Sequence, residues 1–222
     1  MILLLCISLL GAVLCSAVEP LMDYDYSGYA VVQGGKFPAP VIYGETTISD
    51  GLPTALQLDG VKNYLTIPGG ESFSLAKGGT LYAIVKFNPD KEYGMLFFKE
   101  KEFLLGFYRK NLYFNMPNGE PFEAPVYLGA IPVDCWCRIA AVVTVDNGDY
   151  SVRLHLDDKT SPPQVFRNLQ YSKTEGKLTV GKGWGGVWYL HGQIAQLKVF
   201  DVPLTEAQIS TLDQQSPYPF PR

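Results

Sequence analysis

Two carboxylates, Glu100 and Glu102, are the closest approach in this sequence to a catalytic pair. Retaining glycoside hydrolases place an acid and a nucleophile about 5 Å apart, on either side of the bond that is cleaved. On one strand this geometry needs acidic residues at alternate positions, and the chain has no Glu-x-Asp-x-Glu run. Because Glu100 and Glu102 flank Lys101 beside an expected turn, we interpret them as a solvated rim. We predict that the protein is not an enzyme.

The two histidines suggest no other chemistry. His155 falls on the polar side of an alternating segment and is expected to face solvent. His191 has no Glu or Cys at the spacing of a metal site. We interpret both as structural, and the chain has no Gly-x-Ser-x-Gly, Walker or dinucleotide-binding motif.

Aromatic side chains are the stronger functional signal, because a sugar ring stacks its apolar C–H face on indole or phenol. Trp184 lies in the glycine-rich run 181–186, which offers little to bury it. Two interpretations stay open: an exposed stacking residue, or a Trp folded back to cap the core. Trp188 and Tyr189 follow, and on a strand one of such a neighbouring pair faces inward.

A second polar and aromatic patch is expected on the strand faces opposite Phe107 and Phe114, and it contains Tyr108, Arg109, Tyr113 and Asn115. Trp136 is assigned to packing. The predicted ligand-binding residues are therefore Trp184, Trp188, Tyr108, Tyr113 and Asn115.

Cys135 and Cys137 are the only cysteines after residue 17. On one strand they share a face with Cα atoms roughly 6.5–7 Å apart, where a disulfide between them is strained. Two interpretations stay open. The thiols are exposed and link chains into a disulfide-bonded homo-oligomer, or they are buried free cysteines.

Alternation of apolar and polar residues with a period of two recurs along the chain and indicates strands buried on one side. The clearest segment is 150–157. Turns rich in Gly and Asn separate such segments, including Asn147-Gly148 and Gly185-Gly186. Short strands at this spacing predict two packed antiparallel sheets.

One helix is predicted near the end of the chain, over about residues 206–213. Thr205 and Gln208 have the spacing of a capping box, and Leu204 and Ile209 occupy the positions of a hydrophobic staple. We expect this helix to pack against the sandwich.

The chain divides into three parts. Residues 1–17 carry no charged side chain and end in small residues, which predicts a secretory signal peptide cleaved before Val18. They are too few for a membrane span, and no later apolar run is long enough for one. We predict that residues 18–213 form one domain and that residues 214–222, rich in proline and aromatic residues, form a flexible tail. The protein is therefore expected to be secreted and extracellular.

The formal net charge is −4, and Lys and Arg are scattered singly. Nucleic acid is excluded as a partner, because a phosphate backbone needs clustered cations.

The order of the segments resembles the laminin G-like and pentraxin-like branch of the concanavalin A-like lectin/glucanase superfamily. The resemblance is carried by Leu56-Gln57-Leu58-Asp59-Gly60, Tyr64-Leu65-Thr66-Ile67-Pro68, Phe73-Ser74-Leu75, Trp136-Cys137-Arg138-Ile139-Ala140, Leu178-Thr179-Val180-Gly181, Gly192-Gln193-Ile194 and the terminal helix. It implies an all-β, two-sheet antiparallel jelly-roll sandwich with one short helix near the C-terminus.

The chain departs from this branch at a position linked to calcium. Acidic residues commonly follow Gly-x-Ile in the branch, one of which can hold the ion, whereas Ala195 and Gln196 stand here. Other oxygen ligands are scattered without forming a complete loop: Asp50, Asp59, Asp146, Asn147 and Asp149. Calcium is kept as a candidate cofactor without an assigned site.

From these observations we predict a secreted, non-catalytic recognition module that binds glycan or extracellular matrix protein through a sheet face or rim loops. The alternative is a structural extracellular or biomineral matrix protein that acts by assembly. A polysaccharide-active enzyme is the weaker third option, because the carboxylate pair is missing.

Overall fold

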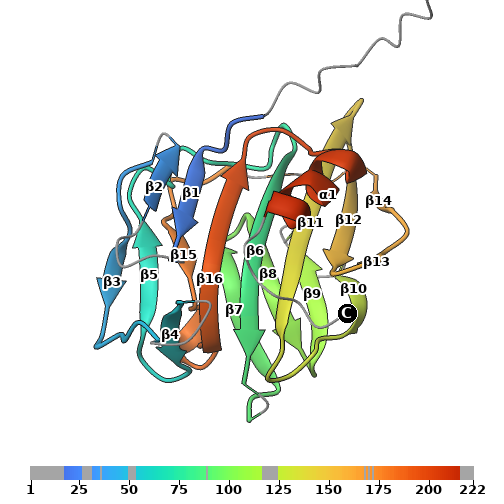
Figure 1. Cartoon of the computed structure of the whole chain (residues 1–222). Helices are drawn as coiled ribbons and strands as arrows, with labels where there is room; N and C mark the ends of the chain where they lie inside the picture. The colour runs from blue at the N-terminus through green and yellow to red at the C-terminus, as the bar shows by residue number, and fades with distance from the viewer. Residues whose placement is uncertain are drawn as a thin grey trace, which may run out of the picture.

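The computed structural model describes residues 18–26, 32–35, 37–49, 54–88, 90–116, 125–167, 169, 171 and 173–215. Two antiparallel sheets pack face to face, and the one described α-helix lies on one of them (Figure 1). This is the jelly-roll sandwich that the sequence predicted. The expected signal peptide lies outside the described residues, as does most of the expected tail.

The nine-stranded sheet has the strand order β13-β12-β11-β6-β16-β1-β2, with β14 paired to β12 and β4 paired to β16. Its strands are β1 (Met22–Asp25), β2 (Val32–Gly35), β4 (Leu56–Asp59), β6 (Gly79–Phe87), β11 (Trp136–Asp146), β12 (Asp149–Leu156), β13 (Lys159–Thr160), β14 (Gln164–Phe166) and β16 (His191–Phe200).

The seven-stranded sheet has the order β10-β9-β8-β7-β15-β5-β3. Its strands are β3 (Val41–Tyr43), β5 (Tyr64–Ile67), β7 (Tyr93–Lys99), β8 (Phe103–Tyr108), β9 (Asn111–Asn115), β10 (Val126–Ala130) and β15 (Leu178–Val180). The edge strand β3 exposes all three of its side chains.

The central core lies between the sheets and follows the predicted alternation. In β8, for example, Phe103, Leu105 and Phe107 point into it without any exposed surface. The expected turn at Asn147-Gly148 joins β11 to β12, and both of its residues have positive φ. The alternate residues of each strand therefore point to the outer side of their sheet.

Helix α1 (Glu206–Gln215) covers the outer side of the nine-stranded sheet. The predicted capping box is confirmed: the backbone N–H of Gln208 donates to Thr205 Oγ1, and the backbone N–H of Thr205 donates to Gln208 Oε1. Leu204 and Ile209 are buried in one apolar cluster with Tyr82 and other outward residues of this sheet.

The prediction that His155 faces solvent is wrong. Its side chain is on the outer side of β12, as the alternation implied, but it is only 7% exposed. Its Nδ1 lies 3.1 Å from the Thr160 hydroxyl. Burial lowers the pKa of His155, although the nearby Glu206 carboxylate opposes this shift.

Candidate functional site

The outer side of the seven-stranded sheet carries a group of aromatic rings, five of which form a connected chain. We call this group the aromatic face, and it consists of Tyr93, Tyr108, Tyr113, Tyr127, Trp184 and Trp188. The ring centroids of Tyr93 and Trp188 are 4.8 Å apart, and those of Trp188 and Tyr108 are 5.8 Å apart. The chain of rings continues from Tyr108 to Tyr113 at 6.0 Å and from Tyr113 to Tyr127 at 5.2 Å. It therefore crosses strands β7 to β10.

Strand alternation places the tyrosines on this side. Phe107, Phe114 and Val126 point into the central core, so their neighbours Tyr108, Tyr113 and Tyr127 point outward. The register then brings the rings together, because Tyr93 is paired with Tyr108 and Tyr113 with Tyr127. Cross-strand neighbours on one side of a sheet are close enough for aromatic contact.

A β-bulge builds the apolar floor of the aromatic face. The register of β7 against β8 shifts between Met95 and Phe97, which adds one residue to β7. As a result Met95 and Phe98, three positions apart, both join Leu104 in a buried cluster on the outer side. Tyr113, Trp184 and Trp188 pack against this cluster.

The loop after β15 brings the two tryptophans onto that floor. The backbone N–H of Gly183 donates to the carbonyl of Trp188 at 3.1 Å, which folds residues 183–188 back on themselves. A Cβ atom at Gly183 would lie 2.4 Å from Met95 Cγ, so the absence of a side chain lets the loop approach the sheet. Gly185 has a φ of 62°, a conformation that suits glycine.

Trp184 fits neither of the two open interpretations fully. It is partly buried, and its ring meets Phe98 edge-on at 5.3 Å with an angle of 74° between the planes. It therefore caps the small outer cluster and not the central core, and part of the indole remains open to solvent.

Asn115 belongs to the same strand face but has no exposed surface. Its Nδ2 donates to the Tyr113 hydroxyl at 3.1 Å, and its Oδ1 has no hydrogen-bond partner. Burial raises the pKa of Tyr113, so this phenol stays protonated. We therefore keep Asn115 in the candidate site as a residue that positions Tyr113, and not as one that touches a ligand.

The expectation that Trp188 or Tyr189 faces inward is wrong, because the segment is a loop and strand alternation does not apply to it. Trp188 contacts Tyr93, whereas the Tyr189 ring lies 6.3 Å from that of Tyr64. Lys182 Nζ lies 4.3 Å from the centroid of Tyr64 and 5.6 Å from that of Tyr189. Sequence reasoning missed this group, because its members are far apart in the chain and no motif joins them.

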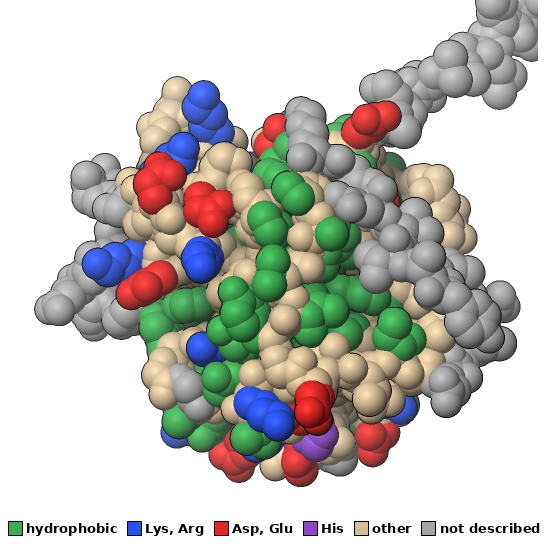
Figure 2. All heavy atoms as spheres, turned by 90° about the vertical axis from the view of Figure 1, so that its left-hand side faces the viewer, with side chains coloured by type: hydrophobic (Ala, Val, Ile, Leu, Met, Phe, Trp, Pro, Cys, Tyr) green, Lys and Arg blue, Asp and Glu red, His purple; other side chains and the backbone are tan. Residues whose placement is uncertain are grey.

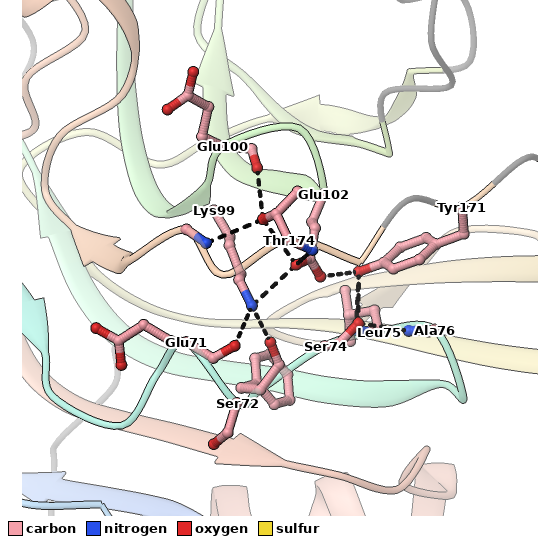
Figure 3. A network of polar contacts seen from close by, with 12 residues as sticks. Glu71, Ser72, Ser74, Leu75, Ala76, Lys99, Glu100, Glu102, Tyr171 and Thr174 are labelled. Carbon is pink, nitrogen blue, oxygen red and sulfur yellow. Dashed lines mark hydrogen bonds and ion pairs between the residues drawn. The ribbon is translucent and has the colours of Figure 1, made fainter.

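The interpretation of Glu102 as part of a solvated rim is wrong, since the residue has no exposed surface. It lies within a network of polar contacts (Figure 3). Its carboxylate forms a buried ion pair with Lys99 at 3.0 Å. It also accepts hydrogen bonds from the Tyr171 hydroxyl at 2.5 Å and from the backbone N–H of Thr174 at 2.6 Å. The Glu100 side chain is exposed and points away from this network.

The contacts of Glu102 also set its charge. Burial by itself raises the pKa of this carboxyl, but the hydrogen bonds from Tyr171 and Thr174 and the charge of Lys99 outweigh burial and leave the pKa below its ordinary value. A buried, ionised and fully engaged carboxylate is neither a proton donor nor a nucleophile. Glu100 and Glu102 therefore do not form a catalytic pair.

The candidate calcium ligands do not converge. Asp59 Oδ1 accepts the backbone N–H groups of Val61, Lys62 and Asn63 at 2.9–3.0 Å, so it closes a turn. Within the described part of the chain, no three Asp, Glu, His or Cys side chains gather closely enough to hold a metal ion. Asp50 lies outside that part.

The two cysteines have different environments. Cys135 is exposed in the bend before β11, whereas the Cys137 side chain is fully buried in the central core. Burial raises the pKa of the Cys137 thiol well above its ordinary value, which makes the reactive thiolate scarce. The prediction of Cys137 as an intermolecular disulfide residue is therefore wrong, and Cys135 remains a prediction.

Residues 59–210 match the Laminin_G_3 family model, described as the concanavalin A-like lectin/glucanases superfamily, and the chain belongs to this family. The superfamily includes both binding domains and glycosidases, so membership by itself does not decide between them. No curated protein matches the chain. None of the helices in the described residues is long and apolar enough to cross a membrane.

Several solved structures share the fold of this chain, and some of them are receptor-binding or ligand-binding domains. One of the solved structures is domain 4 of AbnA, an extracellular arabinanase from Geobacillus stearothermophilus, in complex with arabinotriose. It has a TM-score of 0.68 and 16% identity, over 88% of this chain and 98% of that one. Another is the ligand-binding domain of botulinum neurotoxin serotype D, in complex with N-acetylneuraminic acid. It has a TM-score of 0.71 and 9% sequence identity over 89% of this chain.

The receptor-binding domain of botulinum neurotoxin C/D mosaic serotype also gives a TM-score of 0.71 at 9% identity, over 89% of this chain. The present chain spans about half the length of both neurotoxin domains, covering 51% of each. At these identities the likeness concerns the fold.

Proposed function

We propose that this protein is a secreted, non-catalytic recognition module that binds a glycan on its aromatic face. The observation that carries the proposal is the continuous chain of partly exposed rings from Tyr93 through Trp188, Tyr108 and Tyr113 to Tyr127. Sugars stack on such rings, and phenol hydroxyl groups at their edges offer hydrogen bonds to sugar hydroxyls.

Two neighbours in fold support a glycan as the ligand class. The arabinanase domain is in complex with an arabinose trisaccharide, and the serotype D neurotoxin domain with a sialic acid. The proposal of a non-catalytic role rests on Glu102, since the best candidate for a catalytic carboxylate is held inside the fold by Lys99 and Tyr171. Secretion rests on the uncharged, apolar residues 1–17.

The test is a glycan array with the purified protein, followed by calorimetric titration of the best ligand. We expect Trp188→Ala to weaken binding by about 1–3 kcal/mol, or roughly 5- to 150-fold in Kd. Trp136→Ala is the matched control, because that indole packs on the nine-stranded sheet beneath α1. Repeating the array with a calcium chelator tests the candidate cofactor.

Two results would refute the proposal. One is an array without any bound glycan. The other is a glycan whose affinity survives both Trp188→Ala and Tyr108→Ala while thermal melting shows that both variants are folded.

Assembly is the second candidate function, and the edge strand β3 favours it. Val41, Ile42 and Tyr43 are 45%, 42% and 36% exposed. Figure 2, which views the side of the molecule on the left of Figure 1, shows hydrophobic side chains gathered across its middle. An exposed apolar edge strand can pair with another chain. Sedimentation velocity across a range of concentrations tests this alternative: assembly predicts larger species that Ile42→Lys abolishes.

A further inference from the structure

We propose that the glycan is anionic and that Lys182 binds its carboxylate or sulfate group. This inference rests on the proposed function and narrows it to a class of ligand. The evidence is the charge of the seven-stranded sheet, the contacts of Lys182, and the place of Lys182 beside the aromatic face.

The seven strands of this sheet contain no Asp or Glu, although the whole chain has a formal net charge of −4. The nine-stranded sheet contains several acidic residues: Asp23, Asp25, Asp59, Asp146 and Asp149. The only charged residue in the seven strands is Lys99, which faces inward to Glu102. The strands beneath the aromatic face therefore offer no charge that would repel an anion.

Lys182 is held in place by aromatic rings. Tyr43 stacks on Tyr64 with a centroid distance of 4.6 Å and an angle of 3° between the planes. Tyr43 belongs to β3 and Lys182 to the loop after β15, and these two strands are the neighbours of β5 on its two sides. The Tyr64 ring is therefore already in contact with both Tyr43 and the Lys182 ammonium group. Its role at this point is to support the ammonium group.

The ammonium group of Lys182 is also free to bind an anion. Among the described residues, no carboxylate lies within ion-pair distance of its Nζ, whereas Lys99, Arg138 and Arg153 are each paired with one. A lysine that is fixed by π contacts and not neutralised keeps its charge for a ligand, and binding then costs little ordering of its side chain.

The loop fixes Lys182 relative to the aromatic face. Lys182 pairs with Tyr189 across the fold-back that also joins Gly183 to Trp188. The cation and the indole of Trp188 therefore belong to one short element and move together. Trp188 lies over β7 and β8, and Lys182 lies against Tyr64 of β5, on the other side of β15. An oligosaccharide that stacks on Trp188 and extends across β15 would therefore reach the ammonium group.

A second cation lies on the aromatic face itself. The guanidinium of Arg109 is 5.3 Å from the centroid of Tyr108, at the turn between β8 and β9. Arg109 is exposed, and within the described part of the chain no carboxylate pairs with it. One cation on the aromatic face and a second beside it suit an oligomer with repeated negative charges better than a single charged sugar.

The experiment uses the full secreted chain and three probes: an oligogalacturonate, the same oligomer with methyl-esterified carboxyls, and a sulfated oligosaccharide of equal length. We expect one of the anionic probes to bind at least about tenfold more tightly than the ester. Tighter binding of the oligogalacturonate would show that the ligand group is a carboxylate, and tighter binding of the sulfated probe would show that it is a sulfate. Lys182→Gln should reduce that preference about tenfold and lower the salt dependence, while Lys182→Arg should retain most of it.

Lys77→Gln is the matched control, since Lys77 is an exposed lysine outside the seven-stranded sheet. The inference is overturned if the ester binds as well as the anionic probes, or if Lys182→Gln leaves the preference unchanged. In either case a loss of binding in Trp188→Ala would leave the proposed function standing. If neither the three probes nor any glycan on the array binds, both proposals fail.

Discussion

Glu102→Gln is the sharpest test of whether this carboxylate is structural. The substitution keeps the size of the side chain but removes its charge and one of its two acceptor oxygens. In the native protein one oxygen faces Lys99 at 3.0 Å and the N–H of Thr174 at 2.6 Å, and the other accepts from Tyr171 at 2.5 Å. Gln can accept at only one of these places, and Lys99 is left as a buried charge without a counter-ion.

The expected loss of stability is about 3–5 kcal/mol, as for other buried ion pairs broken on one side. A domain of this size has roughly 5–15 kcal/mol in total, so the variant should remain folded but unfold at much lower denaturant concentration. Equilibrium unfolding in urea, followed by tryptophan fluorescence, measures the difference. Glu100→Gln is the control, and it should change stability by no more than about 0.5 kcal/mol because that side chain is exposed.

The pH dependence gives an independent check. Because the pKa of Glu102 is lower in the folded than in the unfolded protein, ionisation of this group stabilises the fold above the ordinary carboxyl pKa of about 4.5. That contribution is lost as the pH falls below 4.5 and through the folded-state value. The wild type should therefore lose more stability than Glu102→Gln between pH 6 and pH 3. Two results together would refute the structural role of Glu102. One is that Glu102→Gln lowers the free energy of unfolding by less than about 1 kcal/mol at pH 7, and the other is that wild type and variant lose equal stability between pH 6 and pH 3.

Three further predictions concern other parts of the chain. Trp184→Ala should weaken glycan binding and lower the free energy of unfolding by about 1–3 kcal/mol. This is less than for a fully buried Trp, because the indole caps only the outer cluster over Phe98. A large fall in melting temperature with unchanged affinity would remove Trp184 from the site. Cys135 should react with a thiol reagent in the native protein and Cys137 only after unfolding, and disulfide-linked dimers on a non-reducing gel should disappear with Cys135→Ser. The intact mass of secreted protein should correspond to a chain that starts at Val18, whereas retention of Met1 would contradict the predicted signal peptide.

The sandwich could be predicted from the sequence because the patterns that indicate its strands, turns and helix involve residues close together in the chain. Alternation in β8 and β9, the turn at Asn147-Gly148 and the capping box at Thr205 each depend on neighbouring residues, and the structure confirms all three. The same alternation placed Tyr108 and Tyr113 on one outer side, next to each other.

The predictions that proved wrong concern residues whose environment depends on distant segments or on irregular backbone. Glu102 is buried by Tyr171 and Thr174, which lie about 70 positions away, so charge and a nearby turn gave no hint of its burial. The bulge in β7 moved Phe98 to the outer side, against simple alternation from Met95. A bulge has no sequence signal strong enough to be found without the partner strand.

Lys182 shows why the cation beside the aromatic face could not be predicted from the sequence. In the sequence it is one lysine in a glycine-rich loop, and its significance comes from Tyr64 and Tyr43 on strands more than 100 residues earlier. Long-range pairing of β5 with β15 creates the arrangement. Composition alone shows only scattered cations.

The helix and the start of the described chain share one side of the molecule. Val18 and Leu212 both pack against the apolar cluster on the outer side of the nine-stranded sheet. A polypeptide, a tag or a surface joined before Val18 or after Gln215 is therefore attached behind the domain, with the sandwich between it and the aromatic face. A sensor chip coupled at Val18 or at the end of α1 would leave the rings pointing into solution.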